Sequence, residues 1–403
     1  MAETPSPAPQ IQKVLVLYTG GTVGMVPGSA GYVPGQKGDF SKEFRRHPEI
    51  FEKEEKSWFI LPKKVTNECP GKVQVRYQVE EEEKPIDSSK ITPELWDKFA
   101  SKIQENASKY HGFVLLHGTD TLAYTSSALS FLLQGLKKPV VVTGAQRSLF
   151  EPRSDAVDNI LGALMIAGCY CQDPALQLVS VLFNHKLFRG NRVTKYDCDS
   201  FDAFSSPNAE PLVEMGVTIK VNAKPPLDCV ESSQPLTPLK VKSFDVRVLH
   251  LFPGIQKSYV KSVLAGDGGV ILETYGSGNA PDDDWFIDAL KAATDRGVLI
   301  LNCTQVYKGS VRPIYETGTG LEKAGVLSGF DITSEAALTK MLWCLQVTKI
   351  PEERKKIMQK SICGEMTVSE KKDPTADRRV VASPEDLPAA CLLWEKMLSC
   401  DPE

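Results

Sequence analysis

Short apolar runs that end in glycine or polar residues constrain the fold of this chain most strongly. The first half contains VLVLYTGG, GFVLLHG, KPVVVTG and LVSVLFN, and each is typical of a buried strand that runs into a loop. Stretches with helical spacing lie between them, such as ITPELWDKFASKIQ and DAVDNILGALMIAG. This alternation predicts an α/β fold with an open, mostly parallel sheet and helices on both faces.

A polar, Pro-rich break divides the chain, and the same alternation then returns at smaller size. We predict a larger N-terminal catalytic domain over residues 11–215, a linker over 216–242 and a smaller C-terminal α/β domain over 243–360. The Pro-rich residues 1–10 are expected to be disordered, and residues 361–403 to form a helical tail. The irregular stretch GMVPGSAGYVPGQKG after the first strand is expected to be a long mobile loop.

Composition excludes several classes of function. A formal net charge of -4 provides no field to attract nucleic acid, and no run approaches the roughly 18 apolar residues that would cross a membrane. The N-terminus lacks a secretory signal, so we expect a cytoplasmic protein whose 10 cysteines are free thiols. Cys169 and Cys171 have no second pair or nearby histidines, so we expect no metal site.

Three polar clusters follow predicted strands, and the carboxyl ends of parallel strands meet at one edge of a sheet. They are Thr19–Thr22, His117–Thr121 and Arg192–Lys195, and together they supply hydroxyls, a carboxylate and an amine. The first cluster matches neither common nucleotide-binding pattern, and no GxSxG or HExxH motif accompanies the histidines. Taken singly, the threonines are equally consistent with helix caps and the lysine with a solvent-exposed side chain.

The clusters in combination resemble a known family. LYTGGTVGM and VLLHGTDTLAYTSSAL are similar to the two signatures of the L-asparaginases, and IDSS, TGAQR, RGNRVTK, FDAFSSPN and YGSGNAP follow the pattern of the type I branch in order. That branch includes the asparaginase domain of the mammalian 60 kDa lysophospholipases. The resemblance covers about residues 10–360.

The resemblance implies an amidohydrolase that converts L-asparagine to L-aspartate and ammonia through an acyl-enzyme, with no metal or organic cofactor. It implies that Thr22 is the nucleophile, and that Thr119, Asp120 and Lys195 handle protons. Tyr32 resembles the tyrosine of the mobile lid, and the resemblance implies that it is a further catalytic residue.

The resemblance also implies a substrate pocket and an assembly. It assigns substrate contacts to Asp87, Ser88, Ser89, Thr119, Asp120 and Ala145, and to Asn279 and Tyr315 from a neighbouring subunit. A site shared in this way implies a homodimer or homotetramer.

Two departures from the type I pattern affect regulation and charge. Arg247 and Thr304–Gln305 fall in segments comparable to a regulatory asparagine site, but Val306 stands where a bacterial relative has cysteine. The sequence therefore does not decide whether asparagine binding at a second site regulates the protein. Lys90 follows IDSS where the bacterial pattern has an acidic residue.

Three other functions compete with that of an asparaginase. An amidotransferase subunit that supplies ammonia for a tRNA-linked reaction is not expected, because the net charge is negative and the sequence shows no recognisable RNA-facing domain. An asparagine sensor would have lost its catalytic group, yet all four nucleophilic and proton-handling positions are present. A lysophospholipase would be expected to have a nucleophile elbow, and the sequence shows none.

Overall fold

The structure is a computed structural model that describes residues 8–29, 31–223, 245–312 and 316–368. The chain divides into two compact units, Met1–Lys240 and Val241–Glu403. Residues 1–7, most of the predicted linker and the predicted helical tail from residue 369 onward lie outside the described residues, so those assignments stay predictions.

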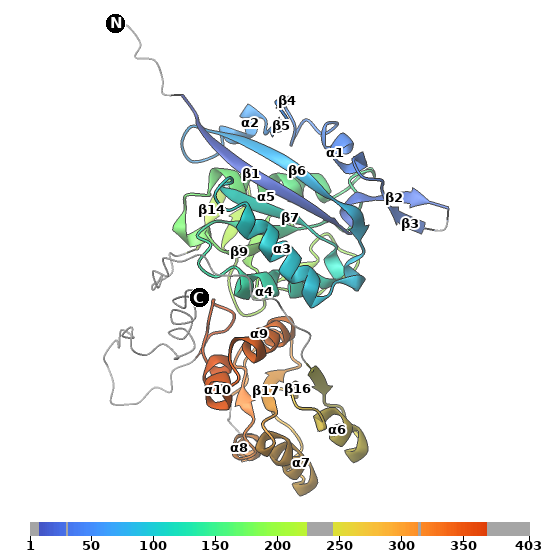
Figure 1. Ribbon diagram of the computed structural model, residues 1–403, viewed down its shortest axis with the longest axis vertical. Coiled ribbons are helices and arrows are strands. Elements are labelled where there is room, and N and C mark those ends of the chain that lie inside the picture. Colours follow the sequence, from blue (N-terminus) through green and yellow to red (C-terminus); the bar gives the residue numbers. More distant parts are fainter. Residues whose placement is uncertain (1–7, 30, 224–244, 313–315, 369–403) are drawn as a thin grey trace, which may run out of the picture. The chain divides into compact units, whose positions relative to one another are not determined.

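The first unit is built on a ten-stranded sheet of order β14-β13-β10-β9-β8-β7-β1-β6-β5-β4 (Figure 1). Its five central strands are parallel: β6 (Val73–Ile86), β1 (Gln10–Gly20), β7 (Gly112–Leu116), β8 (Val140–Thr143) and β9 (Val179–Phe183). The strands at the two edges are antiparallel: β4 (Lys53–Glu55), β5 (Trp58–Ile60), β10 (Lys186–Arg189), β13 (Val213–Met215) and β14 (Ile219–Val221). The predicted open α/β sheet is confirmed, with parallel strands at its centre and antiparallel strands at both edges.

Helices cover both faces of this sheet because its central strands are apolar on both sides. Val14 and Val16 of β1 belong to the buried cluster that contains α5 (Ala156–Cys169). Leu15 and Leu17 alternate with them and are also buried, so they face the opposite side. There α3 (Pro93–Glu105) and α4 (Leu122–Leu132) pack against each other and α4 contacts β8 and β9 (Figure 1).

The expected long loop after the first strand is instead a β-hairpin, so that prediction was wrong. β2 (Met25–Gly28) pairs antiparallel with β3 (Gly31–Pro34), with Val26 opposite Val33 and Pro27 opposite Tyr32. The strands are short and contain Pro and Gly, so they carry no detectable alternation of apolar and polar residues. The unit also contains α1 (Asp39–Phe44), α2 (Lys63–Thr66), β11 (Thr194–Lys195) and β12 (Phe204–Ser205).

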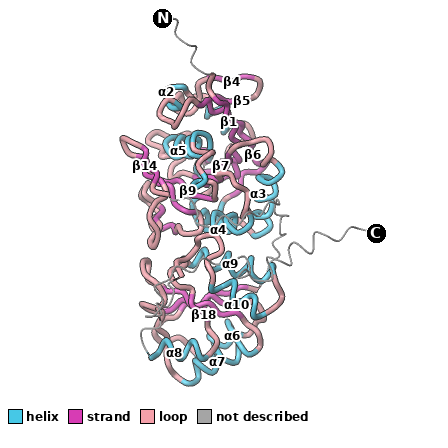
Figure 2. The backbone as a smooth tube through the Cα atoms, turned by 90° about the vertical axis from the view of Figure 1, so that its left-hand side faces the viewer, coloured by secondary structure: helices cyan, strands magenta, loops and turns pink. Residues whose placement is uncertain are grey.

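The second unit has a four-stranded parallel sheet of β15 (Val246–His250), β16 (Gly269–Thr274), β17 (Leu299–Thr304) and β18 (Leu327–Ser328). Both faces of this sheet are apolar, as in the first unit. Leu272 and Ile300 pack with α6 (Lys257–Leu264) and α7 (Asp284–Asp295), whereas Ile271 and Leu301 pack with α9 (Ser334–Val347) and α10 (Pro351–Gln359). Figure 2 shows these helices, with α8 (Glu316–Lys323), around the sheet. The smaller C-terminal α/β domain is confirmed.

A disulfide contradicts the prediction that all cysteines are free thiols. Cys69 lies shortly after α2 and Cys169 ends α5, and their sulfurs are bonded across a sequence separation of 100 residues. Their Cα atoms are 5.5 Å apart, a usual separation for a disulfide, and both residues are buried. The composition argument failed because it cannot show which distant cysteines the fold brings together.

The disulfide leads to a prediction on stability. Reducing it, or replacing Cys69 with serine, should lower the free energy of unfolding of the first unit by about 4 to 5 kcal/mol, because the cross-link closes a long loop in the unfolded chain. Urea titrations with and without reductant would measure this, with the Cys198→Ser variant as a control because Cys198 is free and exposed. Equal unfolding midpoints under both conditions would contradict the prediction.

Candidate active site

The backbones of the first two polar clusters touch at the carboxyl ends of β1 and β7. Gly21 follows β1 with φ of 85°, and a Cβ added there would lie 2.2 Å from the Cα of Gly118. Only glycine permits so close an approach at a positive φ. Thr22 and Thr119 are the next residues after these two glycines, so the fold places the two loops that carry them against each other.

The loop after β6 joins the same edge. A Cβ on Gly118 would lie 2.6 Å from the Ser88 Oγ, and the Thr121 Oγ1 donates a hydrogen bond of 2.7 Å to the Ser88 carbonyl. Ser88 is buried, and Ser89 beside it is exposed. The Asp87 carboxylate accepts a hydrogen bond of 3.0 Å from the Ser89 N–H and so caps this turn.

Lys195 brings the third cluster to the second. It lies on β11, which pairs with β12, and its Nζ donates to the Thr119 Oγ1 and to the Asp120 Oδ1, both at 2.8 Å. The Lys195 side chain is 18% exposed and the Asp120 side chain 66%, while Thr119 is buried. The structure therefore unites a hydroxyl, a carboxylate and an ammonium at a boundary between protein and solvent.

Thr22 and Ala145 lie at the ends of the flanking loops. Thr22 is half-buried and begins a single 3-10 turn, and within the described residues its hydroxyl makes no hydrogen bond. Ala145 is buried after β8, next to Gly144, and a Cβ on Gly144 would lie 2.3 Å from the His117 carbonyl oxygen. The end of β8 thus packs directly against the loop that carries Thr119.

The remaining predicted residues lie elsewhere in the chain. Tyr32 is on β3, is half-exposed, and its hydroxyl donates to the Glu151 carboxylate. Asn279 lies in a turn of the second unit that is closed by a bridge to Tyr275. Tyr315 lies outside the described residues.

His117, the first residue of the second polar cluster, was assigned no role from the sequence, and it is buried beside the loop that carries Thr119. Its Nδ1 is 2.7 Å from the Gly118 carbonyl, which can only accept, so Nδ1 carries the proton. Its Nε2 then accepts from the Thr125 Oγ1 at 3.0 Å, and that oxygen accepts from the Trp96 Nε1 at 3.1 Å. Burial lowers the pKa of His117 to about 4.

The neutral state of His117 predicts a pH dependence of stability. Its pKa is about 4 when folded and 6.5 as a free side chain, so the unfolded chain binds more protons between these values. The contribution of His117 to the free energy of unfolding is fully present above pH 6.5 and falls by about 3 kcal/mol as the pH drops through 4. NMR titration of the His117 ring, assigned with a His117→Gln variant, should show no midpoint above pH 5; a midpoint near 6.5 would contradict the assignment.

The structure separates the residues considered for a regulatory site. Arg247 pairs with Val270 and Thr304 pairs with Thr274, four positions further along the same parallel strand, which is about 13 Å. Arg247 donates to Asp245 and to the Val263 carbonyl, while Gln305 donates to backbone carbonyls at the other end of the sheet. Arg247 and Gln305 therefore lie at opposite ends of the sheet, and a regulatory asparagine site stays a prediction.

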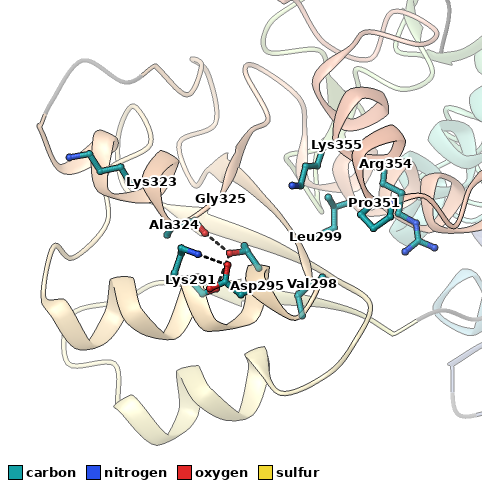
Figure 3. Close-up of a pocket in the computed structure, with 12 residues that line it drawn as sticks. Lys291, Asp295, Val298, Leu299, Lys323, Ala324, Gly325, Pro351, Arg354 and Lys355 are labelled. Carbon is teal, nitrogen blue, oxygen red and sulfur yellow. Dashed lines mark hydrogen bonds and ion pairs between the residues drawn. The ribbon is translucent and has the colours of Figure 1, made fainter. Parts of the chain in front are cut away.

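A hollow in the second unit contains none of the predicted site residues. It lies between the ends of α7 and α8 and the start of α10. Figure 3 shows the ion pair between Lys291 and Asp295 and the hydrogen bond that the Thr294 hydroxyl donates to the Ala324 carbonyl. The Lys291–Asp295 pair is an exposed pair within α7, and the Thr294 hydroxyl beside it donates to the Lys291 and Ala324 carbonyls rather than to a charged side chain.

Neither a metal site nor a membrane span is found in the part of the chain that the structure describes. No group of three His, Cys, Asp or Glu side chains there could hold a metal ion. None of its helices combines the length and the apolar character needed to cross a membrane.

Comparisons with known proteins cover nearly the whole described chain. Residues 13–227 match the family model for the asparaginase N-terminal domain, and residues 245–358 match that for the glutaminase/asparaginase C-terminal domain. L-asparaginase 1 of Escherichia coli is 39% identical over 89% of this chain and 99% of its own. The 60 kDa lysophospholipase of Mus musculus is 38% identical over 89% of this chain but only 63% of its own. The crystal structure of L-asparaginase I from Vibrio cholerae superposes with a TM-score of 0.75 at 37% identity, over 88% of this chain and 99% of that one.

Proposed function

The chain belongs to the asparaginase family, and from that premise we propose that it hydrolyses L-asparagine to L-aspartate and ammonia through an acyl-enzyme on Thr22. The observation that carries the mechanism is the Lys195 ammonium, which donates to both Thr119 and Asp120 in the loop packed against the Thr22 loop. A group that can move protons therefore lies in the loop packed against that of Thr22, whose hydroxyl has no hydrogen-bond partner among the described residues, and this supports the proposed mechanism.

The reaction proceeds in two steps. A threonine hydroxyl is a weak nucleophile at neutral pH, so attack on the side-chain amide requires that its proton be taken up as the Oγ–C bond forms. The Thr119–Lys195–Asp120 group handles this proton and returns one to the departing nitrogen, so that ammonia leaves. Water then attacks the ester, and L-aspartate is released with Thr22 restored.

The loop after β6 holds the amino-acid end of the substrate. The Asp87 and Asp120 carboxylates suit the ammonium group of L-asparagine, and Ser88 and Ser89 suit its carboxylate. Binding this end leaves the side-chain amide to face Thr22, which lowers the entropic cost of attack. The Ala145 backbone lies toward the departing ammonia, and Tyr32 on the β2–β3 hairpin closes over the pocket.

The active assembly is a homodimer or homotetramer in which Asn279 and Tyr315 of a neighbouring subunit complete each site. Phe252 and Tyr259 of the second unit support association, because both are exposed and their rings contact each other, which forms an apolar surface. We also propose a cytoplasmic location.

Ammonia release from L-asparagine and L-glutamine, measured side by side on the purified chain, tests the proposed function. We expect release from L-asparagine without any partner protein. Binding of L-asparagine with no ammonia released would favour a sensor, and release only in the presence of a partner would favour an amidotransferase subunit. Fatty acid released from a lysophospholipid, with no ammonia from L-asparagine, would favour a lysophospholipase.

A further inference from the structure

A chain of three side chains joins the β2–β3 hairpin to the loop that follows β8. The Tyr32 hydroxyl donates to one carboxylate oxygen of Glu151. The other oxygen accepts from the Arg147 Nε at 3.1 Å and lies 3.1 Å from the Arg147 Nη2. The Glu151 side chain is only 15% exposed although it carries a charge, and these two partners satisfy both of its oxygens.

Residues at the start of α5 hold the backbone at Arg147, the residue at one end of this series of three side chains. The Asp155 carboxylate accepts from the N–H groups of Gln146 and Arg147, both at 3.0 Å, and the Ser154 hydroxyl donates to the Arg147 carbonyl at 2.8 Å. Burial raises the pKa of Asp155 above its usual range, and the N–H donors oppose this rise. Arg147 therefore presents its guanidinium from a fixed backbone.

The same loop also supports the residues that follow Thr22. The Leu149 N–H donates to the Val23 carbonyl at 2.9 Å, and the Ser148 hydroxyl donates to the Met25 carbonyl. The loop after β8 thus contacts the base of the hairpin through Ser148 and its far strand through Glu151. Because the hairpin is held at both places, it can move away from the loop after β8 only if the hydrogen bond between Tyr32 and Glu151 breaks.

We propose that Glu151 is a positioning residue that latches the hairpin over the active site through Tyr32, with Arg147 fixing the orientation of its carboxylate. The inference rests on the proposed function, because it assigns the hairpin to the asparaginase site. Loss of the latch lowers the fraction of enzyme with the hairpin closed, and this reduces apparent affinity for substrate by the same factor. The effect therefore falls on KM more than on kcat.

Steady-state kinetics of Glu151 variants test the latch. Glu151→Ala should raise the KM for L-asparagine about tenfold with kcat changed less than about threefold, and Glu151→Gln, which keeps an acceptor for Tyr32, should restore part of the loss. Tyr32→Phe in the Glu151→Ala background should raise KM no further. Glu54→Ala is the matched control, because the Glu54 carboxylate accepts from the Nε and Nη2 of Arg45 in the same way as Glu151 accepts from Arg147. This variant should leave KM unchanged.

Hydrogen exchange without substrate supplies a readout that does not depend on activity. The amides of β2 and β3 should exchange faster in Glu151→Ala than in wild type, and those of β7 should not. If wild type releases ammonia while Glu151→Ala keeps the wild-type KM, the inference is overturned, whatever the exchange rates. If wild type releases no ammonia, the proposed function fails, whereas unchanged exchange in Glu151→Ala would overturn the latch itself.

Discussion

Replacing Thr22 with alanine is expected to lower kcat for L-asparagine by about 10³-fold to 10⁴-fold or more while the protein stays folded. The change removes the proposed acyl-accepting oxygen, for which no other group can substitute in the same position. Thr22 is half-buried in a loop, and its hydroxyl makes no hydrogen bond within the ranges that the structure describes. Its removal should therefore cost little free energy of unfolding.

Steady-state ammonia release and a thermal melt, carried out on the same preparation, measure both parts of this prediction. Thr22→Ser is the matched control, because it keeps the hydroxyl and should retain far more activity than the alanine variant. Wild-type turnover in Thr22→Ala would refute the assignment of the nucleophile.

Replacing Lys195 with methionine should lower kcat by about 10³-fold. The substitution keeps most of the side-chain length but removes the donor shared by Thr119 and Asp120. The buried Thr119 hydroxyl then loses its charged partner, and Asp120 loses the ammonium beside it. Proton transfer in both steps of the reaction should slow, while substrate binding should change less.

Lys186→Met is the control for the Lys195 variant. Lys186 lies on β10 of the same unit and is 4.0 Å from the Asp202 carboxylate, with its side chain 44% exposed. A surface pair of this kind contributes little, so its loss should leave kcat near the wild-type value. Equal losses in the two variants would show a general effect of removing a lysine rather than a role for Lys195.

The fold class could be predicted because its determinants are local in the sequence. The apolar runs of β1, β7, β8 and β9 and the helical spacing of α3 and α5 are continuous segments, and each was recognisable alone. The disulfide between Cys69 and Cys169 could not be predicted, since it depends on which of many distant segments meet in space. The β2–β3 hairpin was missed because its strands are too short to show a period.

The site was predictable to the extent that it depends on residues at strand ends. Thr119, Asp120 and Lys195 were identified from their types and the family resemblance, and the structure brings them into contact. The close approach of Gly21 to Gly118 was not predictable, because any strand can end in glycine for the sake of a turn. Glu151 was missed because its partner Tyr32 is 119 positions away.

Covalent trapping of the acyl-enzyme tests the central claim most directly. Wild-type protein mixed with L-asparagine would be quenched in acid within one turnover, digested and mapped by mass spectrometry. The account predicts that a β-aspartyl group is found on the peptide that contains Thr22, and that it is absent from the Thr22→Ala protein. An aspartyl group on the peptide that contains Thr119, or one that persists in Thr22→Ala, would contradict the account.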